Sequence, residues 1–111
     1  MIKVIVVDDE RFVRMGIVGE TDWASLGCEV VGEAENGLDA LELVHKKNPD
    51  LMICDIRMPK MNGLEMLKKL REEKNPVQVI FLTAYSEFSY AREALKLYAF
   101  DYLLKPFEDG E

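Results

Sequence analysis

The stretch Ile2-Lys3-Val4-Ile5-Val6-Val7-Asp8-Asp9-Glu10 decides the fold, because an aliphatic, mostly β-branched run ends abruptly at three acidic residues. A nearly unbroken apolar run of this length is typical of a strand that is buried on both faces, as in a parallel sheet covered by helices. In such sheets, ligands bind at the carboxyl ends of the strands. The stretch therefore predicts both the kind of sheet and the edge at which chemistry takes place.

The rest of the chain alternates between strand-like and helix-like segments. Leu64, Leu67 and Leu70, for example, recur at i, i+3 and i+6, which is helical spacing. Strands alternating with helices predict βαβ units and an α/β fold with helices on both faces of a parallel sheet. The further strands are expected at residues 28–34, 51–54, 77–82 and 102–104, and the polar composition of the first of these favours a sheet edge.

Composition limits the class of protein. The chain has 111 residues, a net charge of −7, 49% hydrophobic and 32% charged residues, which predicts one globular domain with a packed core. Its acidity argues against a DNA-binding surface within these residues. No apolar run approaches the ~20 residues that cross a bilayer, and no signal pattern precedes the first strand, so we expect no membrane partner and a cytoplasmic location. Cys28 and Cys54 are expected to be buried, reduced thiols.

Acidic and hydroxyl side chains stand where several predicted strands stop. Asp8 and Asp9 end the first strand, Asp55 ends the third, Thr83 ends the fourth and Lys105 follows the fifth. If the first and third strands are neighbours, three carboxylates share one pocket, and such a cluster needs a cation. An all-oxygen site with few ligands suits Mg²⁺, with Mn²⁺ as a possible substitute. A lysine ammonium and a threonine hydroxyl beside that metal would receive a phosphoryl group, with Asp55 as a candidate nucleophile.

The residues resemble the receiver domain of two-component response regulators. The resemblance extends from Ile2 to Phe107 and depends on motifs that occur in order: Val6-Val7-Asp8-Asp9-Glu10, Asp55-Ile56-Arg57-Met58-Pro59-Lys60-Met61-Asn62-Gly63, Leu82-Thr83-Ala84 and Lys105-Pro106-Phe107. It implies a flavodoxin-like doubly wound sheet of five parallel strands in the order 2-1-3-4-5. It also implies a protein that is not an enzyme in the usual sense, because phosphotransfer and autodephosphorylation are self-catalysed at one residue.

The resemblance assigns roles residue by residue. Asp55 is similar to the phosphoacceptor, and Asp9 and Asp55 resemble direct Mg²⁺ ligands. Asp8 would act mainly through metal-bound water, and the main-chain carbonyl of Arg57 would complete the protein ligands. The phosphoryl-binding and switch residues implied by the resemblance are the Thr83 hydroxyl, small Ala84, the Lys105 ammonium and the aromatic Tyr102. Movement of these side chains would bias the surface built from the fourth helix and the fifth strand.

Partners follow from the same resemblance. A sensor histidine kinase is the expected phosphodonor. The segments 22–27 and 33–37 are similar to receivers fused to AraC-type DNA-binding domains, so DNA would be reached only through a C-terminal domain outside these residues. The residues after Lys105-Pro106 are too few for the family's last helix. We therefore expect residues 1–111 to be a single receiver domain, truncated at its C-terminus, with self-association through uncovered apolar surface.

Several alternatives stay open. Asp8-Asp9 after a strand is often a helix N-cap, and an isolated strand-end Asp or Thr is usually turn chemistry. A pseudo-receiver that only binds partners would have the same fold. A Mg²⁺-dependent phosphatase with an aspartyl nucleophile would need a second Asp at the position of Arg57, and a nucleotide or flavin binder would need a glycine-rich loop after the first strand.

Two further expectations concern the loops. Arg57 and Tyr85 lie two residues beyond Asp55 and Thr83, and their bulk is expected to restrict water and so lengthen the lifetime of the phosphorylated state. We expect Asn62-Gly63 to supply a turn, with a positive φ at Gly63 and with Asn62 or its neighbour beginning the next helix.

Overall fold

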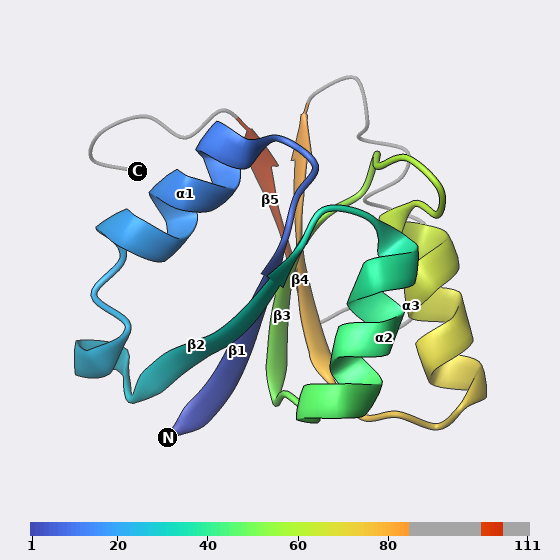
Figure 1. The fold of residues 1–111 in the computed structure, drawn as a ribbon, viewed down its shortest axis with the longest axis horizontal. Coiled ribbons are helices and arrows are strands. Elements are labelled where there is room, and N and C mark those ends of the chain that lie inside the picture. Colours follow the sequence, from blue (N-terminus) through green and yellow to red (C-terminus); the bar gives the residue numbers. More distant parts are fainter. Residues whose placement is uncertain (85–100, 106–111) are drawn as a thin grey trace.

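The computed structural model describes residues 1–84 and 101–105, in which five parallel strands form one sheet of order β2-β1-β3-β4-β5 (Figure 1). This order confirms the doubly wound sheet that the resemblance implied, with the polar strand β2 at an edge. The strands are β1 (Ile2–Val7), β2 (Cys28–Ala34), β3 (Leu51–Asp55), β4 (Gln78–Ala84) and β5 (Asp101–Lys105). The helices are α1 (Arg11–Glu20), α2 (Gly37–Lys47) and α3 (Gly63–Glu72), with a short 3-10 helix at Ala24–Leu26.

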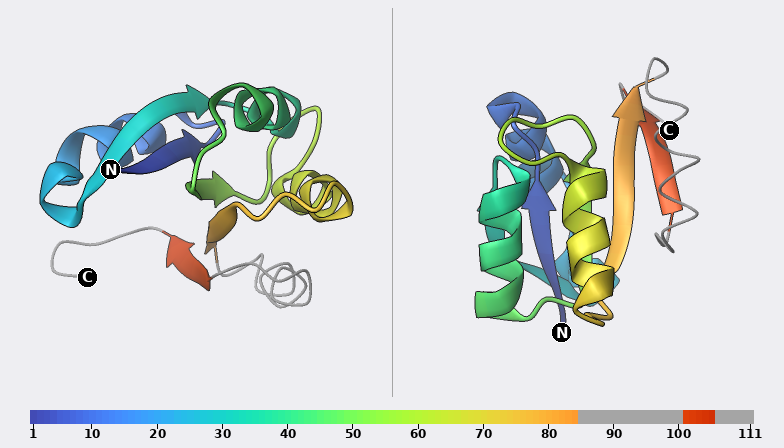
Figure 2. Two further views of the ribbon diagram at one scale, coloured as in Figure 1. Left: turned by 90° about the horizontal axis from the view of Figure 1, so that it is seen from below. Right: turned by 90° about the vertical axis from the view of Figure 1, so that its right-hand side faces the viewer.

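Helices cover both faces of the sheet. Two of them, α2 and α3, lie side by side on one face, and α1 lies on the other (Figure 2). Alternate residues of β1 pack against the two helix layers, because successive side chains of a strand point to opposite faces of the sheet. Ile5 and Val7 pack in the larger core under α2 and α3, whereas Val4 and Val6 pack in the smaller core under α1. The unbroken apolar run of the first strand is therefore explained by burial on both sides.

The position of β1 between β2 and β3 determines where the polar strand ends meet. Its parallel pairing with β3 sets Val7 opposite Cys54, so that the next residues along the two strands are Asp8 and Asp55. The carboxyl ends of the strands all lie at the upper edge in Figure 1. The sequence expectation that the first and third strands place their acidic residues in one pocket is thus confirmed.

Other sequence expectations have mixed outcomes. Cys28 and Cys54 are both free and buried, as predicted. Within the described residues, no helix is long and apolar enough to cross a membrane. The predicted helix between β4 and β5, and the chain after Lys105 where the last helix was expected to be missing or truncated, lie outside the described residues.

Candidate functional site

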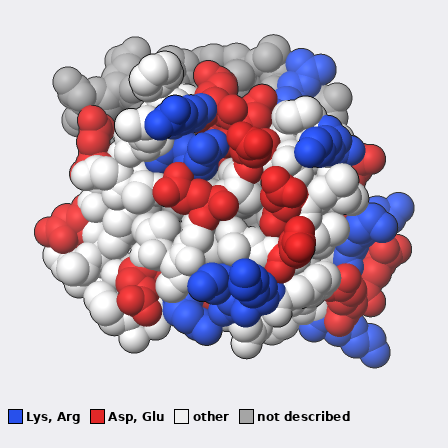
Figure 3. Space-filling view, in the orientation of Figure 1, with Lys and Arg blue, Asp and Glu red and all other residues white. Residues whose placement is uncertain are grey.

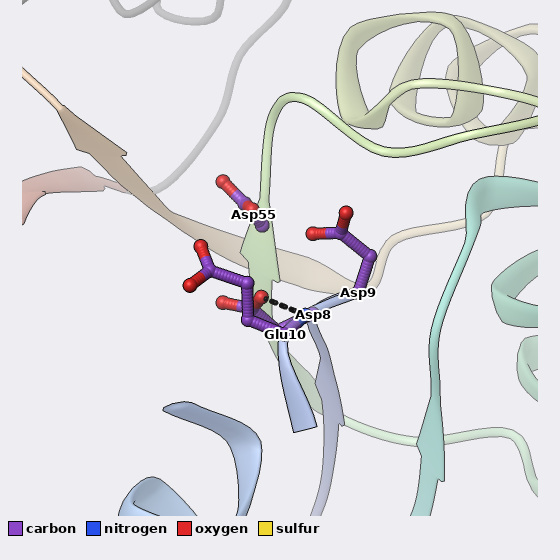
Figure 4. Close-up of side chains that lie close together, drawn as sticks. All are labelled: Asp8, Asp9, Glu10 and Asp55. Carbon is purple, nitrogen blue, oxygen red and sulfur yellow. Dashed lines mark hydrogen bonds between the residues drawn. The ribbon is translucent and has the colours of Figure 1, made fainter. Parts of the chain in front are cut away.

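Four carboxylates gather where β1 and β3 end (Figure 4). Asp8, Asp9 and Glu10 come from the loop that follows β1, and Asp55 is the last residue of β3. One oxygen of each carboxylate lies within 4.8 Å of those of the other three. The three carboxylates predicted to share one site, those of Asp8, Asp9 and Asp55, lie together in the structure.

Asp8 is firmly held within the cluster. It is fully buried, and its main-chain nitrogen donates to the carbonyl oxygen of Ala34 at 3.0 Å. Its carboxylate Oδ1 accepts the main-chain N–H of Glu10 at 2.8 Å, the dashed line in Figure 4. The bond from Glu10 turns the chain sharply at the start of α1, because an aspartate that accepts an N–H two residues ahead closes a turn. The N-cap alternative for Asp8-Asp9 is wrong, because the N-cap residue of α1 is Glu10 and it makes no side-chain cap bond. Asp8 instead closes a turn, and it does so as a member of the cluster.

Glu10 is the site residue that sequence analysis missed. It is the third acidic residue of the run that ends the first strand, and no role was predicted for it. The turn closed by Asp8 brings the Glu10 carboxylate back over the strand end, into reach of Asp55. The run of three acidic residues was the sequence signal that could have pointed to Glu10. The direction of the Glu10 side chain, however, depends on the turn that Asp8 closes.

Asp55 is 5% exposed, and its Oδ1 accepts the main-chain N–H of Ile56 at 2.8 Å. This bond limits rotation of the Asp55 carboxylate, which lies in the cluster with Asp8, Asp9 and Glu10. The preceding residue, Cys54, lies in the core under α2 and α3, so it faces away from the site, as the alternation of a strand predicts.

The loop from Ile56 to Asn62 borders the cluster and carries the exposed side chain of Arg57. It ends at Asn62, whose side chain accepts the Glu65 N–H at 2.8 Å while Glu65 accepts the Asn62 N–H at 3.0 Å. This reciprocal capping box starts α3, as the sequence predicted for Asn62. The expected positive φ at Gly63 is wrong, because within this loop the left-handed residue is Lys60, with φ of 67°. Gly63 is instead required by space, since its main chain lies against Asp55.

The remaining candidates lie at the ends of β4 and β5. Thr83 pairs with Leu104, Ala84 with Lys105 and Phe81 with Tyr102, so Thr83, Ala84 and Lys105 reach the same edge of the sheet as Asp55. Tyr102 lies further down the same strand pair. Tyr85, the second residue assigned to phosphoryl lifetime, lies outside the described residues.

The electrostatic character of this edge is mixed. Acidic side chains gather at the upper part of the molecule, with Lys and Arg side chains beside them (Figure 3). Asp8 and Asp55 are buried carboxylates, and burial of like charges at this separation is costly without a cation. The donor set consists of carboxylate oxygens alone, which are the ligands that Mg²⁺ and Mn²⁺ prefer over nitrogen and sulfur.

Comparison with known proteins gives consistent results. The family model of the response regulator receiver domain matches residues 4–111. The chain is 43% identical over 106 residues to the transcriptional regulatory protein YesN of Bacillus subtilis, which covers 96% of this chain and 29% of that protein. It is 44% identical over 113 residues to the transcriptional regulatory protein BtsR of Salmonella typhimurium, with 98% and 44% coverage. The chain thus spans less than half the length of these curated relatives.

Solved structures agree with the fold. The REC domain of AraT, a response regulator from Geobacillus stearothermophilus, superposes with a TM-score of 0.89 at 45% identity and covers 96% of this chain and 82% of that one. The signal receiver domain of the response regulator NarL from Mycobacterium tuberculosis gives a TM-score of 0.85 at 34% identity, with 96% and 86% coverage. Both similarities extend over nearly the whole chain.

Proposed function

The chain belongs to the response regulator receiver domain family, and from this we propose that it accepts a phosphoryl group on Asp55 from a phosphorylated histidine. The observation that supports the proposal is the position of Asp55. It is a nearly buried carboxylate at the end of a central strand, within 4.8 Å of three other carboxylates. An aspartate that only closed a turn would not need to lie beside three other carboxylates. The receiver is not a classical enzyme, since its proposed reaction modifies the protein itself.

The proposed step is a displacement at phosphorus. A carboxylate oxygen of Asp55 attacks the phosphorus atom of the phosphohistidine, a P–O bond forms and the P–N bond breaks. The leaving imidazole nitrogen takes up a proton from solvent, and Asp55 becomes an acyl phosphate. The Ile56 N–H on Oδ1 keeps the carboxylate in one rotational state, which lowers the entropic cost of reaching the reactive geometry.

The donor set fits a divalent magnesium ion. Asp9, Asp55 and the main-chain carbonyl of Arg57 would hold the ion, Asp8 would act mainly through bound water, and Mn²⁺ could replace Mg²⁺. When bound, the ion offsets negative charge on the carboxylate and on the phosphoryl oxygens. The four carboxylates repel one another at this separation, and a bound cation offsets that repulsion.

The switch residues complete the proposal. Thr83, Ala84 and Lys105 lie at the same sheet edge as Asp55, which supports roles for a hydroxyl and an ammonium in binding the phosphoryl oxygens. Ala84 leaves room for the phosphodonor, and Tyr102 turns inward when Thr83 moves. These movements would shift the population of a two-state surface that includes β5 and the preceding segment, residues 85–100.

The proposed partners follow from the family. A sensor histidine kinase donates the phosphoryl group, and DNA is contacted only through a C-terminal domain outside this chain, as the transcriptional regulatory relatives suggest. We place the protein in the cytoplasm, where such a kinase domain and DNA are both available. Self-association is also proposed, because Phe12 and Met15 on α1 are 86% and 51% exposed.

Incubation with acetyl phosphate, with and without Mg²⁺, followed by intact mass measurement tests the proposal. We expect one phosphoryl adduct that requires Mg²⁺ and is absent from Asp55→Asn. The matched control is Asp50→Asn, an exposed aspartate at the opposite end of β3, which should still form the adduct. An unmodified wild-type protein with every donor would reject the proposal and leave a pseudo-receiver that binds partners only.

A further inference from the structure

Arg14 of α1 connects the acidic cluster to the edge strand β2. Its Nη1 donates to the main-chain carbonyl oxygen of Asp8 at 2.6 Å, and its Nε donates to Oε1 of Glu33 at 3.0 Å. The Arg14 side chain is 16% exposed and that of Glu33 is 43% exposed. The guanidinium therefore contacts the chain at the first residue of the cluster while its own position is fixed by a carboxylate from another strand.

We propose that Arg14 is a positioning residue for the metal site: it holds the Asp8–Asp9 peptide in the orientation that directs the Asp9 carboxylate toward Asp55. This inference rests on the proposed function, because it concerns the site that would hold Mg²⁺. In this proposal Arg14 touches neither the ion nor the phosphoryl group. It acts through the main chain of the residues that bind the ion.

The reason lies in the peptide between Asp8 and Asp9. The peptide unit is planar, so fixing the Asp8 carbonyl also fixes the direction of the following N–Cα bond of Asp9. The Asp8 side chain has its own restraint from the Glu10 N–H, and the Asp8 nitrogen has one from Ala34. Asp9 is exposed and lies in a loop, so the orientation of its carboxylate depends strongly on the peptide that precedes it. A charge-assisted bond of 2.6 Å is a strong restraint on that peptide.

Charge and position make opposite predictions for loss of Arg14. Removal of a positive charge near the cluster would tighten binding of a cation, because it removes Coulomb repulsion. Loss of the peptide restraint would weaken binding, because groups that orient metal ligands typically contribute 10- to 100-fold to metal affinity. The ion pair with Glu33 allows the two effects to be separated, since Arg14→Gln with Glu33→Gln leaves the net charge unchanged.

The test is a titration with Mn²⁺ followed by electron paramagnetic resonance, which counts the free ion, with Mg²⁺ as competitor. We expect Arg14→Gln and the charge-matched double variant to lose about tenfold or more of the affinity of the wild type. The control is Arg71→Gln, which also removes a half-buried guanidinium that donates to a main-chain carbonyl, that of Asn75, but away from the cluster. It should bind Mn²⁺ as the wild type does. Tighter binding by Arg14→Gln, or an unchanged affinity in the double variant, would overturn the proposal.

Urea unfolding of each variant shows whether the folded state is retained under the titration conditions. Arg14→Lys keeps the charge and one donor, so we expect an affinity between those of the wild type and Arg14→Gln; an affinity as low as that of Arg14→Gln would contradict a positioning role through the Asp8 carbonyl. If Arg14→Gln does not fold, the test is made with Arg14→Lys and the double variant.

The outcomes also separate this inference from the proposed function. If the wild type binds Mn²⁺ and is phosphorylated on Asp55, and the Arg14 variants bind Mn²⁺ with the same affinity, only this inference is refuted. A wild type without Mn²⁺ binding refutes the proposed function as well.

Discussion

The first residue of α3, Gly63, packs directly against the main chain of Asp55. A Cβ atom on Gly63 would lie 2.5 Å from the carbonyl oxygen of Asp55 and 2.8 Å from Cε1 of Phe81. The Gly63 nitrogen also donates to the Ile56 carbonyl at 2.7 Å. The loop that borders the acidic cluster is therefore closed by main-chain contacts that only glycine permits.

Gly63→Ala should destabilise the fold. A methyl group at this position must displace main-chain atoms or the Phe81 ring, and overpacking of this kind costs about 1–3 kcal/mol. The matched control is Gly16→Ala in the interior of α1, where a Cβ meets no atom within 4 Å among the described residues. There the change should stabilise by roughly 0.5–1 kcal/mol, because alanine favours helix. Urea unfolding gives the free energy of unfolding of both variants. An equal change in the two would show that the close packing of Gly63 against Asp55 and Phe81 does not restrict this position.

Asn62→Ala should lower the free energy of unfolding by about 1 kcal/mol, because the variant loses the N-cap acceptor of α3 and half of the capping box with Glu65. Asn62→Asp is the matched control, since aspartate caps as well as asparagine, and it should differ from the wild type by less than about 0.5 kcal/mol. Chemical denaturation checks both values. A loss as large in Asn62→Asp would show that the amide has another role.

The sequence alone predicted the structure correctly where a local residue pattern is compatible with only one kind of structure. The unbroken apolar run ending at Asp8 requires burial on both faces, and in the structure that run is β1, an interior strand between β2 and β3. The polar composition of residues 28–34 similarly predicted an edge strand. The pairing of the first strand with the third was different: it followed from resemblance to a family, because nothing local in either strand specifies its neighbour in the sheet.

Expectations failed where the outcome depends on particular contacts and turns that the pattern of residue types does not specify. Gly63 was expected to supply a positive φ. Glycine is instead needed there because a Cβ would collide with Asp55 and Phe81, and no local sequence pattern reveals that contact. Glu10 was missed because the direction of its side chain depends on the bond from its nitrogen to Asp8. Arg14 gave no sequence signal, since its partners, Asp8 and Glu33, lie six and nineteen residues away.

Arg57→Ala, combined with Tyr85→Ala, should shorten the lifetime of the phosphorylated state. Both residues stand two positions beyond a proposed site residue, and Arg57 is exposed in the loop after β3. Removal of this bulk admits the water that hydrolyses the acyl phosphate, so the decay rate should rise severalfold. Loss of phosphoprotein after removal of the donor gives the rate, with the exposed Lys68→Ala on α3 as control. An unchanged decay rate in the double variant would refute this role.

Asp9→Asn should have opposite effects on stability with and without metal. Without a divalent ion, the four carboxylates repel one another, and two like charges about 4 Å apart in water cost ~1 kcal/mol, so removal of one charge should raise the free energy of unfolding by about 0.5–1 kcal/mol. With Mg²⁺ at about 100 times its dissociation constant, the wild type gains ~2.7 kcal/mol because only the folded state binds the ion.

Asp9→Asn should lose most of that gain, so the order of stability of the two proteins reverses when Mg²⁺ is added. The control is Glu42→Gln, an exposed carboxylate on α2 outside the cluster, which should keep the full Mg²⁺ increment. Urea unfolding in EDTA and in Mg²⁺ measures the free energy of unfolding of the wild type and of both variants. The reversal separates the two interpretations of the acidic run, because a carboxylate that served only as a turn or surface residue would give the same difference in both solutions.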